Sequence, residues 1–302
     1  MEKILIVGPA SQILGVKIAE ELGIETVDTE SKSFPDGENY LRLNIEDETI
    51  IQGKEVIIVQ STGPSSNADQ NKRLFELAMM IDSVKRIGSK KIIVVVPYLA
   101  YARQDKIFRP GECPFATTII RMINSFNIDE FYTVDLHEPK ILVDFSCKAI
   151  NVDSMKLLAD YIKELGAKDI VVVSPDKGAV ERSKAFAKYF GDDILVEYFE
   201  KVRDVKTGDI AMSGKLSLKN KDVVIADDII ATGGTMATAI KLSKESGANR
   251  VYAVATHALM LQQAKYRILK AGADEIIGTD SIDNELAKVS LAKTIADFLK
   301  FD

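Results

Sequence analysis

The chain has few cysteines and no long apolar run, and both shortages exclude broad classes of protein. Cys113 and Cys147 are the only cysteines among 302 residues, too few for a disulfide scaffold and too far apart for a close-spaced metal pair. This usage is typical of a reduced compartment, and we expect a cytoplasmic protein. The longest nearly unbroken apolar stretch, residues 92–102, is far shorter than the roughly 20 residues that a membrane-spanning helix needs.

Basic residues are also in deficit. The chain has 39 basic against 45 acidic residues, a net charge of −6, so we do not expect a protein that coats nucleic acid by neutralising phosphates. A local basic pocket stays compatible with this balance. Residues 1–10 enter a short apolar run without a basic leader, so we expect no signal peptide. An apolar fraction of 46% and a charged fraction of 28% are ordinary for a soluble globular protein, and the length predicts about two domains.

Short β-branched runs alternate with longer helical patterns along the whole chain. Such runs are typical of strands that are buried on both faces of a parallel sheet and separated by helices, so the sequence predicts an α/β fold. The predicted strands are 4–7, 56–59, 92–96, 131–134, 170–173, 223–226, 251–255 and 275–278.

The two halves of the chain resemble each other in order. The matched segments are 4–23 with 170–189, 54–62 with 221–229, 88–96 with 247–255, and 128–135 with 273–280. We interpret them as two copies of one doubly wound domain, over residues 1–149 and 150–283, although any two α/β segments share some likeness. The amphipathic pattern of residues 284–302 predicts a C-terminal helix, which one interpretation joins to the first domain.

Residues 226–235, ADDIIATGGT, combine two acids with a glycine loop before a helical pattern at 235–246. Glycines let successive N–H groups converge on an anion, and the start of a helix favours phosphate. A glycine-rich turn without a ligand is the alternative. Carboxylates upstream of such a loop suit the hydroxyls of a pentose 5-phosphate. The same acids could bind Mg²⁺, and both interpretations can hold in one site.

This stretch resembles the binding motif for 5-phosphoribosyl 1-diphosphate (PRPP), found in phosphoribosyltransferases and ribose-phosphate diphosphokinases. One departure is Ala231, where many diphosphokinases have an aspartate before TGGT. The backbone cradle does not need that side chain, so we expect binding to survive. The resemblance implies that ribose 5-phosphate is bound by Asp227, Asp228, Ala231, Thr232, Gly233, Gly234 and Thr235.

Two further segments are similar to the diphosphokinases rather than to the transferases. Residues 33–43 look like the family segment that joins the ATP site across a subunit contact, although FPDGE alone would be a turn. Residues 97–105, PYLAYARQD, match a second family segment in which arginine can grip phosphate. The residues implied to bind ATP are Phe34, Asp36, Gly37, Glu38, Arg103 and Gln104.

The remaining family segments imply a metal site and a catalytic loop. His137, in VDLHEPK, and Asp176, in VSPDKG, are implied to lie beside Mg²⁺, whereas a single histidine is otherwise usually structural. Lys201 and Arg203, in EKVRD, resemble a catalytic K-x-R loop, although the same residues could form an ordinary solvated charge run. Cations over a transferring diphosphoryl group would stabilise charge that grows in the transition state.

The resemblance covers essentially the whole chain. It implies two duplicated phosphoribosyltransferase-like domains, each a mainly parallel sheet flanked by helices, and Mg²⁺-dependent transfer of the diphosphoryl group of ATP to ribose 5-phosphate. It also implies a homo-oligomer, at least a dimer, with no nucleic-acid or membrane partner. Two alternatives are a phosphoribosyltransferase and a non-catalytic homologue of the synthetase. Intact Lys201, Arg203, His137 and Asp176 argue against the second.

Overall fold

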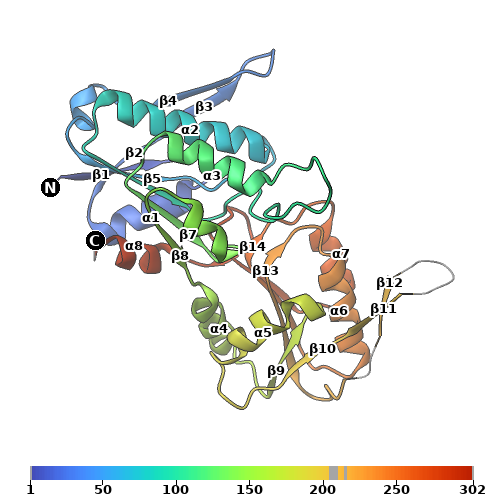
Figure 1. Ribbon diagram of the computed structural model, residues 1–302. Helices are drawn as coiled ribbons and strands as arrows, with labels where there is room; N and C mark the ends of the chain where they lie inside the picture. The colour runs from blue at the N-terminus through green and yellow to red at the C-terminus, as the bar shows by residue number, and fades with distance from the viewer. Residues whose placement is uncertain (1, 204–209, 214–215, 301–302) are drawn as a thin grey trace. The chain divides into compact units, whose positions relative to one another are not determined.

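The computed structural model describes residues 2–203, 210–213 and 216–300, without the side chains of residues 200–203 and 210–213 (Figure 1). The chain divides into two compact units. The first unit comprises Met1–Asp153, Asp280–Asn284 and Ser290–Asp302, and the second comprises Ser154–Thr279 and Glu285–Val289.

Within the described residues, the first unit is built on a six-stranded sheet with the order β2-β1-β5-β6-β7-β8, in which every neighbouring pair is parallel. A separate antiparallel hairpin, β3–β4, extends from it. The strands are β1 (Lys3–Val7), β2 (Glu25–Val27), β3 (Thr29–Ser33), β4 (Asn39–Leu43), β5 (Glu55–Val59), β6 (Lys91–Val96), β7 (Glu130–Val134) and β8 (Lys148–Val152). The helices are α1 (Gln12–Leu22), α2 (Gln70–Ile87), α3 (Phe115–Ser125) and α8 (Ala292–Lys300), with 3-10 turns η1 (Glu48–Ile50) and η2 (Pro139–Asp144).

The second unit repeats this plan with the sheet order β10-β9-β13-β14-β15-β16, again parallel at every described pair. The hairpin β11–β12 stands apart from the sheet. The strands are β9 (Ile170–Ser174), β10 (Val196–Tyr198), β11 (Glu200–Arg203), β12 (Ile210–Ser213), β13 (Asp222–Ile230), β14 (Val251–Ala258), β15 (Glu275–Thr279) and β16 (Ala287–Val289). The helices are α4 (Met155–Glu164), α5 (Val180–Ala187), α6 (Gly234–Glu245) and α7 (Ala264–Lys270), with the turn η3 (Lys177–Ala179).

Helices cover both faces of each sheet, as the unbroken apolar strands predict. In the first unit, α2 and α3 lie on one side and α1 and α8 on the other (Figure 1). In the second unit, alternate residues of β13 face opposite layers. Val223 and Ile225 share a core with α6 and α7, whereas Val224 and Ala226 share one with α4 and α5. The predicted α/β fold of two duplicated, helix-flanked parallel sheets is confirmed.

The C-terminal segment differs from the single helix predicted over residues 284–302. Residues Ala287–Val289 form β16, which pairs with β15 in the second unit, and the helix begins only at Ala292. The apolar positions of this segment are buried in either conformation, so a helical pattern alone does not show where pairing with a sheet edge replaces the helix. Helix α8 packs against α1 in the first unit. In the part of the chain that the structure describes, every helix is too short or too polar to cross a membrane.

Candidate functional site

The two adjacent acids of the second unit lie inside strand β13, which continues four residues beyond the apolar run predicted for it. Asp227 stands in register with Ala255 of β14, and Asp228 is buried, with 4% of its surface exposed. One guanidinium nitrogen of Arg182, on α5, donates to both carboxylates, at 3.0 Å to Asp227 Oδ1 and 2.5 Å to Asp228 Oδ1. The acid pair is therefore held at a fixed position by a cation.

The protonation of this pair is unusual. Burial, together with the neighbouring Asp228 carboxyl, raises the pKa of Asp227 to about 7, although Arg182 acts in the opposite direction. Two carboxyl groups that share one site cannot both ionise easily, because like charges repel in a medium that water does not screen. Near neutral pH, Asp227 can thus accept hydrogen bonds as a carboxylate or donate one as an acid.

The glycine loop, residues 231–235, directly follows strand β13 and leads into helix α6, as predicted from the sequence. Gly233 has a φ of +69°, and a Cβ atom there would come within 3.0 Å of Ile268 and 3.2 Å of Ala264 on α7. At Gly234, by contrast, a Cβ atom would meet open space. The first position is a glycine because of backbone conformation and packing, and the second leaves room for a close approach to the backbone.

The start of α6 has the features of an anion site. Gly233 is the residue before the helix, so no side chain caps the amides of the first turn. The side chains of Thr232 and Thr235 are exposed beside them. The carbonyl oxygens of the loop point elsewhere, since Leu261 N donates to Ala231 O at 2.8 Å and Arg267 donates to Thr232 O. Uncapped amides and two hydroxyls are thereby left for a phosphate group.

Asp176 lies in the turn after β9, at the same end of the sheet as the acid pair. Its Oδ1 accepts hydrogen bonds from the amides of Gly178 at 2.9 Å and Ala179 at 3.1 Å, so the residue caps the turn η3. A carboxylate that is held by two amides is oriented, which suits a ligand of a cation but also suits a purely structural cap.

The predicted catalytic residues Lys201 and Arg203 have backbone positions in β11, which pairs with β12 in the antiparallel hairpin. Lys201 stands opposite Met212, and Arg203 stands opposite Ile210. Their side chains lie outside the described part of the molecule.

In the first unit, the FPDGE segment forms the tip of the β3–β4 hairpin (Figure 1). The turn is closed by Phe34 N donating to Glu38 O at 2.8 Å and by Glu38 N donating to Asp36 Oδ1 at 3.1 Å, with Gly37 at a φ of +94°. The Phe34 ring is 44% exposed and meets Tyr40 edge-on at 6.2 Å between ring centres. An exposed aromatic ring on a formed turn is available for stacking.

Arg103 and Gln104 lie in the turn after β6, and both side chains are exposed. The turn is fixed by Tyr101, which has a φ of +66° and accepts a hydrogen bond on its carbonyl from Gln104 N at 2.8 Å. The Tyr101 ring stacks on Phe115 at 4.8 Å between ring centres. A hydrogen-bonded turn therefore presents an exposed cation and an exposed amide.

His137 is half-buried just beyond the end of β7, in the first unit. The preceding backbone is anchored to β8, because Asp135 N donates to Val152 O at 3.0 Å and Leu136 N donates to Asn151 Oδ1 at 2.8 Å. Among the described residues, no group of three or more His, Cys, Asp and Glu side chains could hold a metal ion by itself.

Each unit thus brings its own predicted residues to the carboxyl ends of its strands or to a hairpin. In the second unit these residues are the acid pair, Asp176 and the loop 231–235. Arg182 and Arg267, which hold the acids and the loop, were not predicted. Arg182 lies six residues after Asp176 in the helix that follows β9, and no local sequence pattern indicated its contact with the acids.

Comparison with known proteins shows which family the chain resembles. Residues 3–126 match the family model for the N-terminal domain of ribose phosphate pyrophosphokinase, the enzyme also called diphosphokinase, and residues 146–291 match the model for the phosphoribosyl transferase domain. A ribose-phosphate pyrophosphokinase of Methanobrevibacter smithii is 39% identical over 98% of this chain and 99% of the relative. One of Methanosarcina acetivorans is 38% identical over 98% and 99%.

A crystal structure of phosphoribosylpyrophosphate synthetase from Mycobacterium smegmatis superimposes with a TM-score of 0.86 at 30% identity, over 99% of this chain and 98% of that one. The likeness therefore extends through both units and is not limited to the glycine loop. The chain belongs to the ribose-phosphate pyrophosphokinase family and is an enzyme of that class.

Proposed function

We propose that this enzyme transfers the diphosphoryl group of ATP to the 1-hydroxyl of ribose 5-phosphate, giving PRPP and AMP, and that it depends on Mg²⁺. The observation that carries the proposal is the juxtaposition, in one unit, of a carboxylate pair with the uncapped start of α6. One end of ribose 5-phosphate is a set of hydroxyls and the other is a phosphate, so its chemistry matches both parts.

In this proposal the ribose 5-phosphate lies with its phosphate on the loop 231–235 and its hydroxyls on Asp227 and Asp228. The first-turn amides of α6 and the hydroxyls of Thr232 and Thr235 bind the phosphate. The acids accept hydrogen bonds from vicinal hydroxyls, which fixes the sugar by both ends. Ala231 contributes no side-chain contact to the ligand, and its carbonyl oxygen already accepts a hydrogen bond from Leu261 N.

ATP is assigned to the residues of the first unit. Phe34 stacks on adenine, while Asp36, Gly37 and Glu38 contact the nucleotide from the hairpin tip. Arg103 binds phosphate oxygens and Gln104 orients the nucleotide. A hairpin tip that serves a neighbouring subunit's site requires an assembly, so we propose a homo-oligomer of at least two chains.

The donor groups fit a hydrated Mg²⁺ rather than a metal enclosed by protein. Mg²⁺ usually keeps several waters and is bound by one or two protein groups together with substrate phosphates, so a cluster of protein ligands is not required. His137 and Asp176 are the residues that would hold it, and the amides on Asp176 Oδ1 orient that carboxylate. When bound, Mg²⁺ neutralises charge on the polyphosphate.

In the reaction, the 1-hydroxyl oxygen of the sugar forms a bond to the β-phosphorus of ATP and gives up its proton to solvent. The bond between that phosphorus and the oxygen bridging it to the α-phosphorus breaks, and AMP leaves. Most of the catalysis in such a transfer comes from positioning and charge stabilisation. We assign the stabilisation of the transferring group to Lys201 and Arg203.

Purified protein is mixed with Mg²⁺, ribose 5-phosphate and ATP labelled at the β-phosphorus, and the nucleotide product is followed. The expected result is AMP together with label in PRPP. Formation of ADP would indicate transfer of a single phosphoryl group and would refute the proposal. Consumption of PRPP with a nucleobase, without AMP formation from ATP, would favour a phosphoribosyltransferase instead.

The catalytic assignment has its own control. Lys201→Ala should lower the rate of AMP formation by at least about a hundredfold, the scale for losing one group that stabilises transition-state charge. Lys241→Ala removes a lysine of α6 whose side chain is 69% exposed, and should leave the rate unchanged. Equal rates in the two variants would exclude Lys201 from catalysis.

We also propose a cytoplasmic location, with which the free cysteines Cys113 and Cys147 are compatible.

A further inference from the structure

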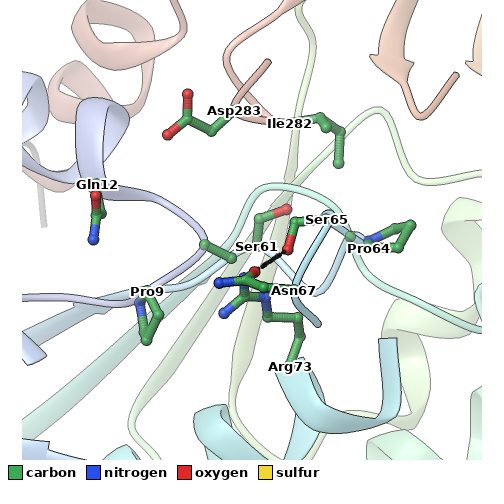
Figure 2. A pocket seen from close by; sticks show the side chains of 11 residues that line it. Pro9, Gln12, Ser61, Pro64, Ser65, Asn67, Arg73, Ile282 and Asp283 are labelled. Carbon is green, nitrogen blue, oxygen red and sulfur yellow. Dashed lines mark hydrogen bonds between the residues drawn. The ribbon is translucent and has the colours of Figure 1, made fainter. Parts of the chain in front are cut away.

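Helix α2 carries a buried ion pair that no step of the proposed reaction uses. One terminal nitrogen of Arg73 donates to Glu76 Oε2 at 2.8 Å, and the two side chains are 5% and 0% exposed. The other terminal nitrogen donates to Ser65 Oγ at 2.9 Å and to Asn67 Oδ1 at 3.3 Å, in the loop after β5 (Figure 2). A buried pair adds little net stability over packed apolar side chains, because both charges lose their hydration. A role in fixing geometry therefore accounts for it better than a role in stability.

Glu76 joins three segments of the first unit that lie far apart in the sequence. Besides Arg73 of its own helix, its Oε2 accepts a hydrogen bond from Gln60 Nε2 at 3.1 Å, at the end of β5. Its Oε1 accepts one from the Ser31 hydroxyl of β3 at 2.5 Å. The carboxylate is thus held by α2 and by the end of β5, and it is presented to the β3–β4 hairpin at Ser31.

The β3–β4 hairpin has few buried contacts of its own. It forms a two-stranded sheet separate from the parallel sheet of the first unit (Figure 1). Among the described residues of its two strands, Leu43 alone is buried. At the base of the hairpin, Thr29 donates to Val7 O at 3.0 Å. A lone two-stranded hairpin is marginally stable in water, so attachment beyond the base decides how firmly its tip is held.

That attachment is made to α2. Strand β4 packs against the helix, and Ser31 donates to the buried Glu76. Lys72, one turn earlier on α2, donates to Ser33 Oγ at 3.1 Å, but that contact is exposed. A hydrogen bond to a charged acceptor away from water contributes more than an exposed one, so the bond from Ser31 is the stronger attachment. Ser31 lies three residues before Phe34, about 10 Å along an extended strand.

We propose that Glu76, balanced by Arg73, is a positioning residue that fixes the β3–β4 hairpin on α2 and thereby sets where Phe34 meets the adenine of ATP. The proposal rests on the assignment of ATP to the hairpin tip under the proposed function. Glu76 is buried and acts through Ser31. When the hairpin leaves α2, the apparent affinity for ATP falls with the fraction of molecules in which the hairpin is attached. Binding of ribose 5-phosphate, assigned to the second unit, is unaffected.

The test uses Ser31→Ala, which removes the donor on the hairpin and leaves the bonds of Glu76 to Arg73 and Gln60 in place. Two measurements are made on the full-length protein: amide hydrogen exchange of peptides over residues 29–43 without substrate, and the KM values for ATP and ribose 5-phosphate. Because a hydrogen bond to a charged acceptor is lost, exchange should be at least about fivefold faster and the KM for ATP at least about threefold higher. The kcat and the KM for ribose 5-phosphate should stay the same.

Three further variants separate positioning from general destabilisation. Ser31→Thr keeps the hydroxyl on a strand that tolerates β-branched residues, so exchange and KM should stay near those of the unchanged protein. Ser243→Ala removes a buried hydroxyl of α6 that donates to Ala239 O at 2.8 Å, and should change neither exchange in residues 29–43 nor the KM for ATP. In a Glu76→Gln background, Ser31→Ala should have a smaller effect than alone, because the charged acceptor is already gone. If Glu76→Gln does not fold, the variants of Ser31 decide the question.

The proposal is overturned if Ser31→Ala leaves exchange in residues 29–43 unchanged, or if Ser31→Ala leaves the KM for ATP unchanged while Phe34→Ala raises it. Equal effects of Ser31→Ala with and without Glu76→Gln would also overturn it, since Ser31 would then act through another partner. If neither Phe34→Ala nor Ser31→Ala changes the KM for ATP, the assignment of ATP to the hairpin fails, and the role of Glu76 in nucleotide binding fails with it. The exchange measurement is made without ATP, so it distinguishes that failure from a hairpin that Glu76 does not hold.

Discussion

Replacing Arg182 by glutamine is expected to move the pH dependence of ribose 5-phosphate binding toward alkaline pH. Arg182 donates to Asp227 and Asp228 at 3.0 and 2.5 Å. A charge pair about 4 Å apart is worth about 4 kcal/mol at an effective dielectric constant of 20. The Arg182 side chain is 30% exposed, so solvent screening reduces this to about 1.5–3 kcal/mol. At 1.36 kcal/mol per unit, the pKa of Asp227 should rise by roughly one to two units.

The sign follows from what the ligand prefers. Sugar hydroxyls donate to an ionised carboxylate and so stabilise it, which means that affinity rises as the pH passes the pKa of the acid. In the unchanged protein that pKa is about 7. Without the guanidinium the midpoint should lie one to two units higher, and at pH 7 the affinity of Arg182→Gln should be roughly tenfold lower.

The assay is titration calorimetry with ribose 5-phosphate across this pH range, on the unchanged protein, Arg182→Gln and Arg182→Lys. Lysine keeps the positive charge, so its midpoint should stay near that of the unchanged protein. The second ionisation of the sugar phosphate, at about pH 6, affects all three proteins alike and cancels in the comparison. A glutamine variant with an unmoved midpoint would show that Arg182 does not set the ionisation of the acid pair.

Three further predictions concern the loop, the C-terminal helix and the nucleotide. Gly233→Ala should lower the free energy of unfolding by about 1–3 kcal/mol in urea titrations, because of its positive φ and its contacts with α7, whereas Gly234→Ala should change it by no more than about 0.5 kcal/mol. Asp280→Ala leaves the buried Leu291 amide without its 2.8 Å acceptor and should cost about 1–3 kcal/mol by the same measurement. Phe34→Ala should raise the KM for ATP by roughly fivefold to a hundredfold, because stacking on one base contributes about 1–3 kcal/mol. Phe75→Ala removes another exposed ring of the first unit and should leave the KM unchanged.

The sheets were predictable because their central strands carry the strongest local signal. Each of the eight apolar runs that the sequence indicated is part of a strand, since a strand buried on both faces is apolar along nearly its whole length. The edge strands β2, β8, β10 and β16 were missed. They are short and only partly buried, as in the exposed Glu25 and Thr26 of β2, so pairing with the neighbouring strand and not composition determines them.

The candidate site was predictable to the extent that its groups are adjacent in sequence. The acid pair and the loop 231–235 lie close together in the sequence, and such a local pattern can be recognised without knowledge of the fold. Arg182 is 45 residues away from Asp227 along the chain and meets it only because α5 returns along the sheet between β9 and β10. No local pattern distinguishes that arginine from a solvated one, so the contact needed the structure.

The two units share one sheet topology but carry different side chains at equivalent positions. In the sequence overlay, Gln60 and Ser61 stand where the second unit has Asp227 and Asp228. Gln60 uses its amide within the fold, accepting from Ala10 N at 3.0 Å, and Ser61 donates to Ser281 O at 2.7 Å. The equivalent acids instead lie on a strand that stays paired with β14 to Ile230, so the backbone pairing fixes their position beside the loop 231–235. Two adjacent, partly buried carboxylates need a cation to balance their charge, and α5 supplies Arg182.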